Sequence, residues 1–210
     1  DLDAYDAFTI NICEWALEKI ESFVGNLSSC DCMCELKVTN KHYDYFGYAV
    51  SASADGNTLV VGAYGERSDA RGIDGDQTSN LMDRSGAVYV FVRSGANWTQ
   101  QAYIKASNTG SGDLFGRAVS LSGDGNTLAV GAHAEGSNAI GINGDQTNNL
   151  MPTSGAVYVF VQSGTSWTQQ AYIKASNTEA GDYFGQIGIS LSTDGNTLAV
   201  GAVYEGSNAT

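Results

Sequence analysis

The chain repeats one nine-residue stretch three times. The stretch reads DGNTLVVGA in its first copy and DGNTLAVGA in the next two, at Asp55–Ala63, Asp124–Ala132 and Asp194–Ala202. A Phe-Gly pair precedes each copy, and the three phenylalanines stand 69 residues apart, at Phe46, Phe115 and Phe184. Repetition at a fixed period of this length indicates that one structural unit is copied along the chain.

The second copy predicts four short strands in each unit. Alternating or continuous apolar residues mark the expected strands at Arg117–Ser122, Thr127–Ala132, Ala156–Val161 and Trp167–Ala175. The Asp-Gly and Gly-Asn pairs of Asp124–Asn126 accept the positive φ of a tight hairpin turn, and a long polar loop covers residues 135–153. The third strand is almost wholly apolar, so we expect it to be buried on both faces of an antiparallel sheet.

A repeated four-stranded sheet must bury its faces against its own copies, which predicts radial blades or a linear stack. The predicted fold class is therefore all-β, with blades of four antiparallel strands. The expected parts are an orphan fourth strand at 35–39, blades at 42–107 and 111–176, and a half blade at 180–210. One extra residue between Phe184 and Asp194 predicts a β-bulge near Gly188.

The repeat resembles the FG-GAP repeat of the β-propellers in integrin α subunits. The resemblance covers residues 35–210 and rests on three motif pairs: Asp44–Gly47 with Val61–Ala63, Asp113–Gly116 with Val130–Ala132, and Asp182–Gly185 with Val200–Ala202. It implies a propeller used in adhesion or extracellular binding. In two features the chain departs from the family pattern. The Asp-x-Asp-x-Asp-Gly calcium loop between the first two strands is missing, and Tyr64, His133 and Val203 stand where the motif has proline.

About two and a half blades are too few for a closed ring, because propellers have about four to eight. Either another chain completes the incomplete ring by strand exchange, or this stretch is a fragment of a longer, integrin-like ligand-binding propeller. The expected partner is accordingly protein, either further copies of the chain or adjoining propeller sequence.

The long polar loops contain oxygen-bearing side chains at alternate positions that could bind calcium weakly. The candidate ligands are Asp74, Asp76, Thr78 and Asn80 in the first copy, and Asn143, Asp145, Thr147 and Asn149 in the second. Carboxylates are few and a terminal glutamate is missing. The alternative interpretation is therefore a network of Asx turns that orders each loop through side-chain to backbone bonds.

Several acidic residues recur in every unit, which favours structural over catalytic roles. They are Asp44, Asp113 and Asp182 before the Phe-Gly pairs, and Glu66, Glu135 and Glu205 after the Gly-Ala pairs. We expect them to cap turns and to hydrogen-bond between blades. We expect His42 and His133 to lie on the surface. Without a Ser/His/Asp set, a histidine metal cluster or a phosphate loop, an enzyme on a propeller scaffold is the disfavoured class.

The N-terminal segment, 1–34, differs in composition from the repeats. Its apolar residues recur at helical spacing and predict a short amphipathic helix that ends at Gly25. All four cysteines lie here, at Cys13, Cys30, Cys32 and Cys34, and their spacing favours disulfides over a metal site. Acceptor patterns for N-glycosylation at Asn26, Asn97 and Asn208 agree with an extracellular or cell-surface setting.

A formal net charge of −13 makes nucleic acid an unfavourable partner. No apolar run approaches the roughly 20 residues that span a bilayer as a helix. The sequence thus predicts a non-enzymatic adhesion or structural protein, and the assembly of such subunits into a filament is one form that this function can take.

Overall fold

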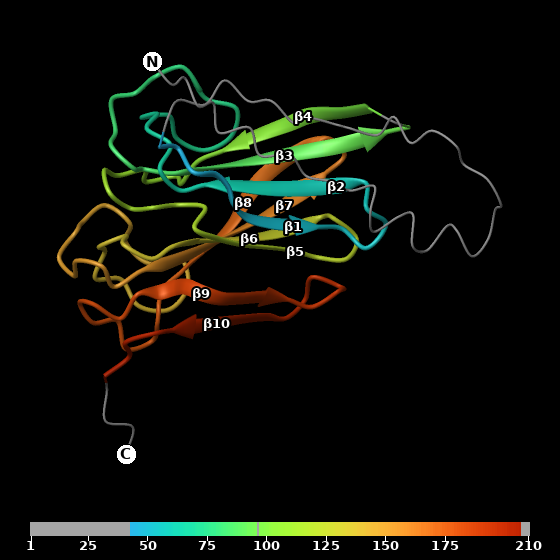
Figure 1. Cartoon of the computed structure of the whole chain (residues 1–210). Helices are drawn as coiled ribbons and strands as arrows, with labels where there is room; N and C mark the ends of the chain where they lie inside the picture. The colour runs from blue at the N-terminus through green and yellow to red at the C-terminus, as the bar shows by residue number, and fades with distance from the viewer. Residues whose placement is uncertain (1–42, 96, 207–210) are drawn as a thin grey trace.

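A computed structural model describes residues 43–95 and 97–206, and this part of the chain consists of strands and loops without a helix. Figure 1 shows the strands as three stacked layers. In chain order the strands are β1 (Phe46–Ala52), β2 (Thr58–Ala63), β3 (Ala87–Ser94), β4 (Asn97–Ile104), β5 (Ala118–Leu121), β6 (Thr127–Ala132), β7 (Ala156–Ser163), β8 (Ser166–Ile173), β9 (Phe184–Leu191) and β10 (Leu198–Ala202).

The first two sheets have the same topology. Each has four antiparallel strands in sequence order, β1-β2-β3-β4 and β5-β6-β7-β8. Their registers also match, since Ala63 faces Ala87 in the first sheet and Ala132 faces Ala156 in the second. The all-β prediction and its blades of four antiparallel strands are confirmed by this arrangement.

The third sheet contains β9 and β10. Its register shifts where Val200 faces Ile189 but Ala202 faces Phe184, so β9 has extra residues at this point. Gly188 lies within the irregular stretch and has a φ of 69°, a value that favours glycine. The predicted bulge near Gly188 is confirmed.

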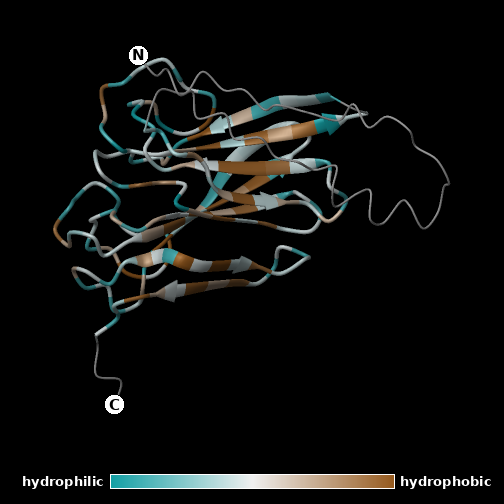
Figure 2. Cartoon of the chain, in the orientation of Figure 1, coloured by the Kyte–Doolittle hydropathy of each residue, from teal (hydrophilic) through white to brown (hydrophobic). Residues whose placement is uncertain are grey.

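The described residues form two core clusters, one shared by the first and second blades and one within the first blade. Figure 2 shows hydrophobic residues along the strands of the stacked sheets. Val60, Val88 and Val90 of the first blade pack in one cluster with Phe115 and Tyr158 of the second. The Phe115 and Tyr158 rings meet edge to face, with centroids 5.4 Å apart, which is a favourable aromatic geometry. Burial of this shared surface holds neighbouring blades together.

Serine side chains link the first strands of neighbouring blades. The backbone N–H of Leu121 donates to Oγ of Ser51 over 3.0 Å, and that of Leu191 donates to Oγ of Ser120 over 2.9 Å. The same bond at each junction fixes how one blade sits on the next.

The predicted strands agree closely with the observed ones. The second strand of the middle unit has the predicted bounds, and the first five residues of β3 and β7 are buried, as the apolar pattern predicts. The hairpin turn after β5 has Gly125 at a φ of 75°. The predicted N-terminal helix at 1–34 and the orphan strand at 35–39 lie outside the described residues.

Candidate functional site: the loop-bearing end of the blades

The two ends of the sheets differ in what connects the strands. Short hairpin turns join the strands at one end, whereas the long loops 64–86 and 133–155 gather at the other (Figure 1). The connections from one blade to the next, 105–117 and 174–183, also lie at this loop-bearing end.

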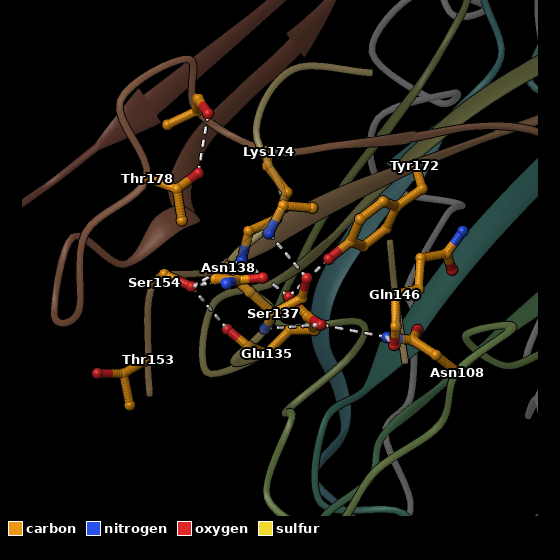
Figure 3. A network of polar contacts seen from close by, with 12 residues as sticks. Asn108, Glu135, Ser137, Asn138, Gln146, Thr153, Ser154, Tyr172, Lys174 and Thr178 are labelled. Carbon is orange, nitrogen blue, oxygen red and sulfur yellow. Dashed lines mark hydrogen bonds and ion pairs between the residues drawn. The ribbon is translucent and has the colours of Figure 1, made fainter. Parts of the chain in front are cut away.

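A buried polar network supports the loop-bearing end of the second blade (Figure 3). Oε2 of Glu135 accepts from Nζ of Lys174 and from the hydroxyl of Tyr172, each over 2.9 Å. Lys174 also donates to Oγ of Ser154 over 2.7 Å, and the backbone N–H of Ser137 donates to Oε1 of Glu135 over 3.1 Å. The carboxylate and the ammonium thus satisfy each other away from water.

The first blade repeats the lysine, glutamate and serine contacts of this network at the equivalent positions, but without the bond that Tyr172 makes, since the Tyr103 hydroxyl has no hydrogen-bond partner among the described residues. Nζ of Lys105 lies 2.7 Å from Oε2 of Glu66 and 2.7 Å from Oγ of Ser85. The backbone N–H of Ser68 donates to Oε1 of Glu66 over 2.8 Å. The shared lysine, glutamate and serine contacts in two blades indicate a structural device that orders the long loop.

Burial shapes the ionisation of these groups. Desolvation lowers the pKa of Lys105 and of Lys174, and the attraction of Glu66 and of Glu135, respectively, opposes it. Burial, followed by the negative charge of Glu135, raises the pKa of Asp113 to about 6. Because Glu66, Lys105, Glu135 and Lys174 are at most 3% exposed, the network offers no surface for a substrate.

A link between blades extends the network. Nδ2 of Asn108, in the connection that follows β4, donates to Oε1 of Glu135 over 3.2 Å. The Tyr158 hydroxyl donates to Oδ1 of the same Asn108 over 2.5 Å. Oδ2 of Asp113 caps a turn by accepting from the backbone N–H of Gly110 over 2.8 Å. The predicted capping and blade-to-blade bonds are confirmed at Asp113 and Glu135.

An open polar cleft of about 650 Å³ lies beside Asn108, between loops of the first and second blades. Arg71 lines it from the first blade, and Asp145, Gln146 and Thr147 line it from the second. The cleft walls are tied together, because Nδ2 of Asn108 also donates to the backbone oxygen of Gln146 over 3.2 Å.

A second exposed feature is a group of tyrosines near the start of β1, here called the tyrosine cluster: Tyr45, Tyr48 and Tyr64 with Arg117. The rings of Tyr45 and Tyr64 stack with centroids 4.6 Å apart, and Tyr48 meets Tyr64 edge to face at the same distance. The guanidinium of Arg117, from the second blade, lies 5.1 Å from the Tyr48 ring centre and 5.4 Å from that of Tyr64. Cation–π attraction therefore joins two blades here.

The position equivalent to Tyr64 in the second blade is His133, and its prediction as a surface residue is wrong. His133 is 4% exposed, because Tyr183 of the third blade lies against it with ring centroids 5.8 Å apart. Burial, followed by the charge of Arg117, lowers the pKa of His133 to about 4. The other histidine, His42, lies outside the described residues.

Comparison with known protein families agrees with this architecture. The FG-GAP repeat matches residues 40–91, 98–160 and 167–210. The chain belongs to the FG-GAP repeat family. No match was found among curated proteins.

The FG-GAP matches at 98–160 and 167–210 are offset from the sheets by one strand, because they begin in β4 and in β8. The match at 98–160 begins in β4 of the first blade and ends in β7 of the second. One sequence repeat therefore contributes to two neighbouring sheets, and it contains both Asn108 and Glu135, the two residues that link the blades.

The candidate calcium residues of the FG-GAP long loops make hydrogen bonds within the protein. Oδ1 of Asp74 accepts from the backbone N–H of Tyr103 over 2.9 Å, and Asn143 does the same for Tyr172. Oδ1 of Asp76 accepts from the backbone and hydroxyl of Thr78, and Asp145 does the same for Thr147. In these loops Asn80 donates to the oxygen of Thr78, and Asn149 lines the polar cleft.

The bonds of Thr78 to Asp76 and of Thr147 to Asp145 are Asx turns, whereas Asp74 and Asn143 bind backbone N–H groups 29 residues away in β4 and β8. Both kinds of bond engage oxygens that a cation would need. Among the described residues, no group of three or more His, Cys, Asp or Glu side chains is placed to hold a metal ion. The donor set fits calcium poorly, and calcium binding stays a prediction.

The remaining candidates from the sequence are the cysteines and the glycosylation asparagines. The four cysteines, together with Asn26 and Asn208, lie outside the described residues. Asn97 is exposed at the start of β4, and its glycosylation stays a prediction. In the part of the chain that the structure covers, no helix is long and apolar enough to cross a membrane.

Sequence reasoning missed the lysines of the buried network. Lys105 and Lys174 stand in two identical copies of the stretch QQAYIKASNT. A lysine that repeats directly after an apolar strand needs an anionic partner if it is buried, and the repeated Glu66 and Glu135 were available as that partner. The tyrosine cluster gave no comparable signal, because Tyr48, Tyr64 and Arg117 are far apart in the sequence.

Proposed function

We propose that this FG-GAP protein is a non-enzymatic extracellular or cell-surface protein whose blades serve adhesion or structural assembly. In this proposal, the loop-bearing end binds partners and the sheets form the scaffold. Membership of the FG-GAP repeat family supports the class of function, and the division between buried and exposed positions supports the choice of surface.

A comparison of the first two blades is the observation that carries the proposal. The buried network has the same residues in both blades, because Glu66 corresponds to Glu135 and Lys105 corresponds to Lys174. At the loop-bearing end the equivalent positions differ, since Tyr48 corresponds to Arg117 and Arg71 corresponds to Ile140. A constant buried network with substitutions at some exposed positions, beside others such as Asp76 and Asp145 that stay the same, is an arrangement that a binding scaffold can have.

An adhesion assay tests this function directly. Beads coated with the purified chain should retain intact cells or extracellular matrix of the source organism, and beads coated with heat-unfolded chain should not. When intact cells of the source organism are treated with a protease that cannot enter them, the protease should digest the chain. Failure of both the retention and the surface digestion would contradict the proposal.

Assembly through strand exchange is a second candidate, supported by the third sheet. β10 has the same sequence, LAVGA, as the corresponding part of β6, which pairs with β7 along its outer edge. Among residues 43–95 and 97–206, the sheet that contains β10 has only β9 as a second strand. A free strand edge accepts another strand readily, and another copy or adjoining propeller sequence could supply that strand.

The mass of the purified chain in solution tests this second candidate. Under non-reducing conditions, a discrete or polydisperse assembly larger than 22.0 kDa would support completion by another copy. A monomer that folds poorly would instead support completion by adjoining propeller sequence. The same mass measurement in a calcium chelator tests the long loops. Loss of the assembly in the chelator would indicate that these loops bind a cation.

A further inference from the structure

The tyrosine cluster has side chains that are partly exposed to solvent at the loop-bearing end of the first blade. Tyr45 is 40% exposed and Tyr48 is 52% exposed, and the neighbouring Tyr43 is 57% exposed. Aromatic side chains usually bury most of their surface in a core or an interface. Three partly exposed tyrosines close together in the sequence therefore indicate a contact surface for a ligand.

The cluster is held in shape before any ligand arrives. Tyr64 stacks on Tyr45 with 7° between the ring planes and meets Tyr48 at 80°. Arg117 lies over both Tyr48 and Tyr64, which fixes the cluster to the second blade. Because tyrosine has few rotatable bonds and these rings are already packed, binding costs little conformational entropy.

The charges around the cluster disfavour a cation at short range and a polyanion at long range. Burial raises the pKa of Tyr64, and the positive guanidiniums of Arg117 and Arg84 oppose this shift, so both arginines act on its phenol. A cationic ligand meets these like charges at short range. A polyanion meets a chain with a formal net charge of −13.

We propose that the tyrosine cluster binds a neutral saccharide. The C–H face of a pyranose ring is flat and apolar and stacks on an aromatic ring, while its hydroxyls hydrogen-bond to water and to phenol groups. Tyr45 and Tyr48 provide both features, a ring face and a hydroxyl. The proposal rests on the adhesion function, for which it names the class of ligand.

The third blade extends the same type of surface. Tyr204 is 66% exposed, and its ring lies edge to face with that of Tyr183, with centroids 5.4 Å apart. Tyr183 in turn contacts His133, whose blade also supplies Arg117. Aromatic rings at both junctions suit an oligosaccharide that contacts more than one blade.

An array of neutral and acidic oligosaccharides, followed by calorimetry with the neutral compound that binds, tests the proposal. Tyr48→Ala and Tyr45→Ala should each weaken binding about tenfold, the loss that removal of one stacked ring causes in other aromatic platforms. Tyr48→Phe should retain most of the affinity. Leu81→Ala is the matched control, because Leu81 is 80% exposed in the long loop outside the cluster.

Three outcomes would overturn the proposal. They are binding of acidic compounds alone, binding that Tyr45→Ala and Tyr48→Ala leave unchanged, and no binding of any neutral compound by the folded chain. If Tyr48→Ala abolishes retention of cells on coated beads while no saccharide binds, the cluster recognises a protein. In that case the adhesion function stands and the saccharide proposal falls.

Discussion

Nζ of Lys174 lies 2.9 Å from Oε2 of Glu135, and both side chains are at most 1% exposed. The lysine follows β8 and the glutamate follows β6, so the ion pair connects two segments that are 39 residues apart. Removing two charges from water is costly, and the pair offsets this cost only because Ser154 and Tyr172 complete its hydrogen bonds. The long loop of the second blade thus depends on a complete network.

Breaking this pair should destabilise the protein strongly. Lys174→Met leaves a buried carboxylate without its cation, and we expect a loss of about 3–5 kcal/mol in the free energy of unfolding. The double variant Glu135→Gln with Lys174→Met should be more stable than the sum of the single losses predicts, by about 1–3 kcal/mol. Urea unfolding of the unchanged protein, Lys174→Met, Glu135→Gln and the double variant measures the single losses and the departure from their sum.

The partly exposed ion pair between Arg67 and Asp83 is the matched control. Nε of Arg67 lies 3.3 Å from Oδ1 of Asp83, and the side chains are 40% and 64% exposed. Asp83→Asn should therefore change stability by about 1 kcal/mol or less. Equal losses at the buried and the exposed pair would contradict the role assigned to the network.

Asp113 should make the protein less stable as the pH rises from about 4 to 6. Burial raises its pKa from 3.8 to about 6, so the folded state holds this proton more tightly than the unfolded state does. Stability therefore falls as the pH rises through this window, by about 2–3 kcal/mol from this residue. Relative to the unchanged protein, Asp113→Asn should have a more favourable free energy of unfolding at pH 7.5 than at pH 4. Urea unfolding at both pH values measures this difference.

His133 should act in the opposite direction. Its pKa falls from 6.5 to about 4 on burial, so the unfolded state binds the proton more readily between these values. Stability contributed by the neutral ring is present above pH 6.5 and is lost as the pH falls toward 4, by about 3 kcal/mol. His133→Gln should flatten this part of the pH profile, and an unchanged slope would show that the ring is more accessible to water than its contact with Tyr183 indicates.

Local signals explain why much of the fold could be predicted. The Asp-Gly-Asn turn and the run TLAVGA define a hairpin within a few residues, and the structure has β6 at Thr127–Ala132. The Gly188 bulge followed from one extra residue in an otherwise constant period. The hairpin and the bulge depend on residues that are close together in the sequence, so the sequence alone predicts them.

The parts that could not be predicted depend on packing between blades. His133 is buried because Tyr183, 50 residues later, covers it, and no local pattern shows this contact. Arg117 was assigned only to the start of a strand, but its guanidinium lies over rings of the preceding blade. The contacts at the loop-bearing end therefore could not be predicted from the sequence, since they form between residues of different blades.

Glycines at one repeated position provide a test of blade packing. A side chain at Gly62 would collide with the backbone oxygen of Gly116 in the next blade, and one at Gly131 would collide with that of Gly185. At the equivalent Gly201, the nearest atom to an added Cβ is the oxygen of Ile187 at 3.2 Å, within the same sheet. Only the first two positions thus lie at a junction between described blades.

Gly62→Ala and Gly131→Ala should each destabilise the protein by about 3 kcal/mol or more, because a backbone oxygen cannot move aside without separating the blades. Gly201→Ala should cost about 1 kcal/mol or less in this chain, since its neighbour needs to shift by only a few tenths of an ångström. Thermal and urea unfolding of the three variants measure the difference. Equal losses at all three positions would mean that the constraint lies within each sheet, whereas a loss confined to Gly62 and Gly131 locates it in the close contact between blades.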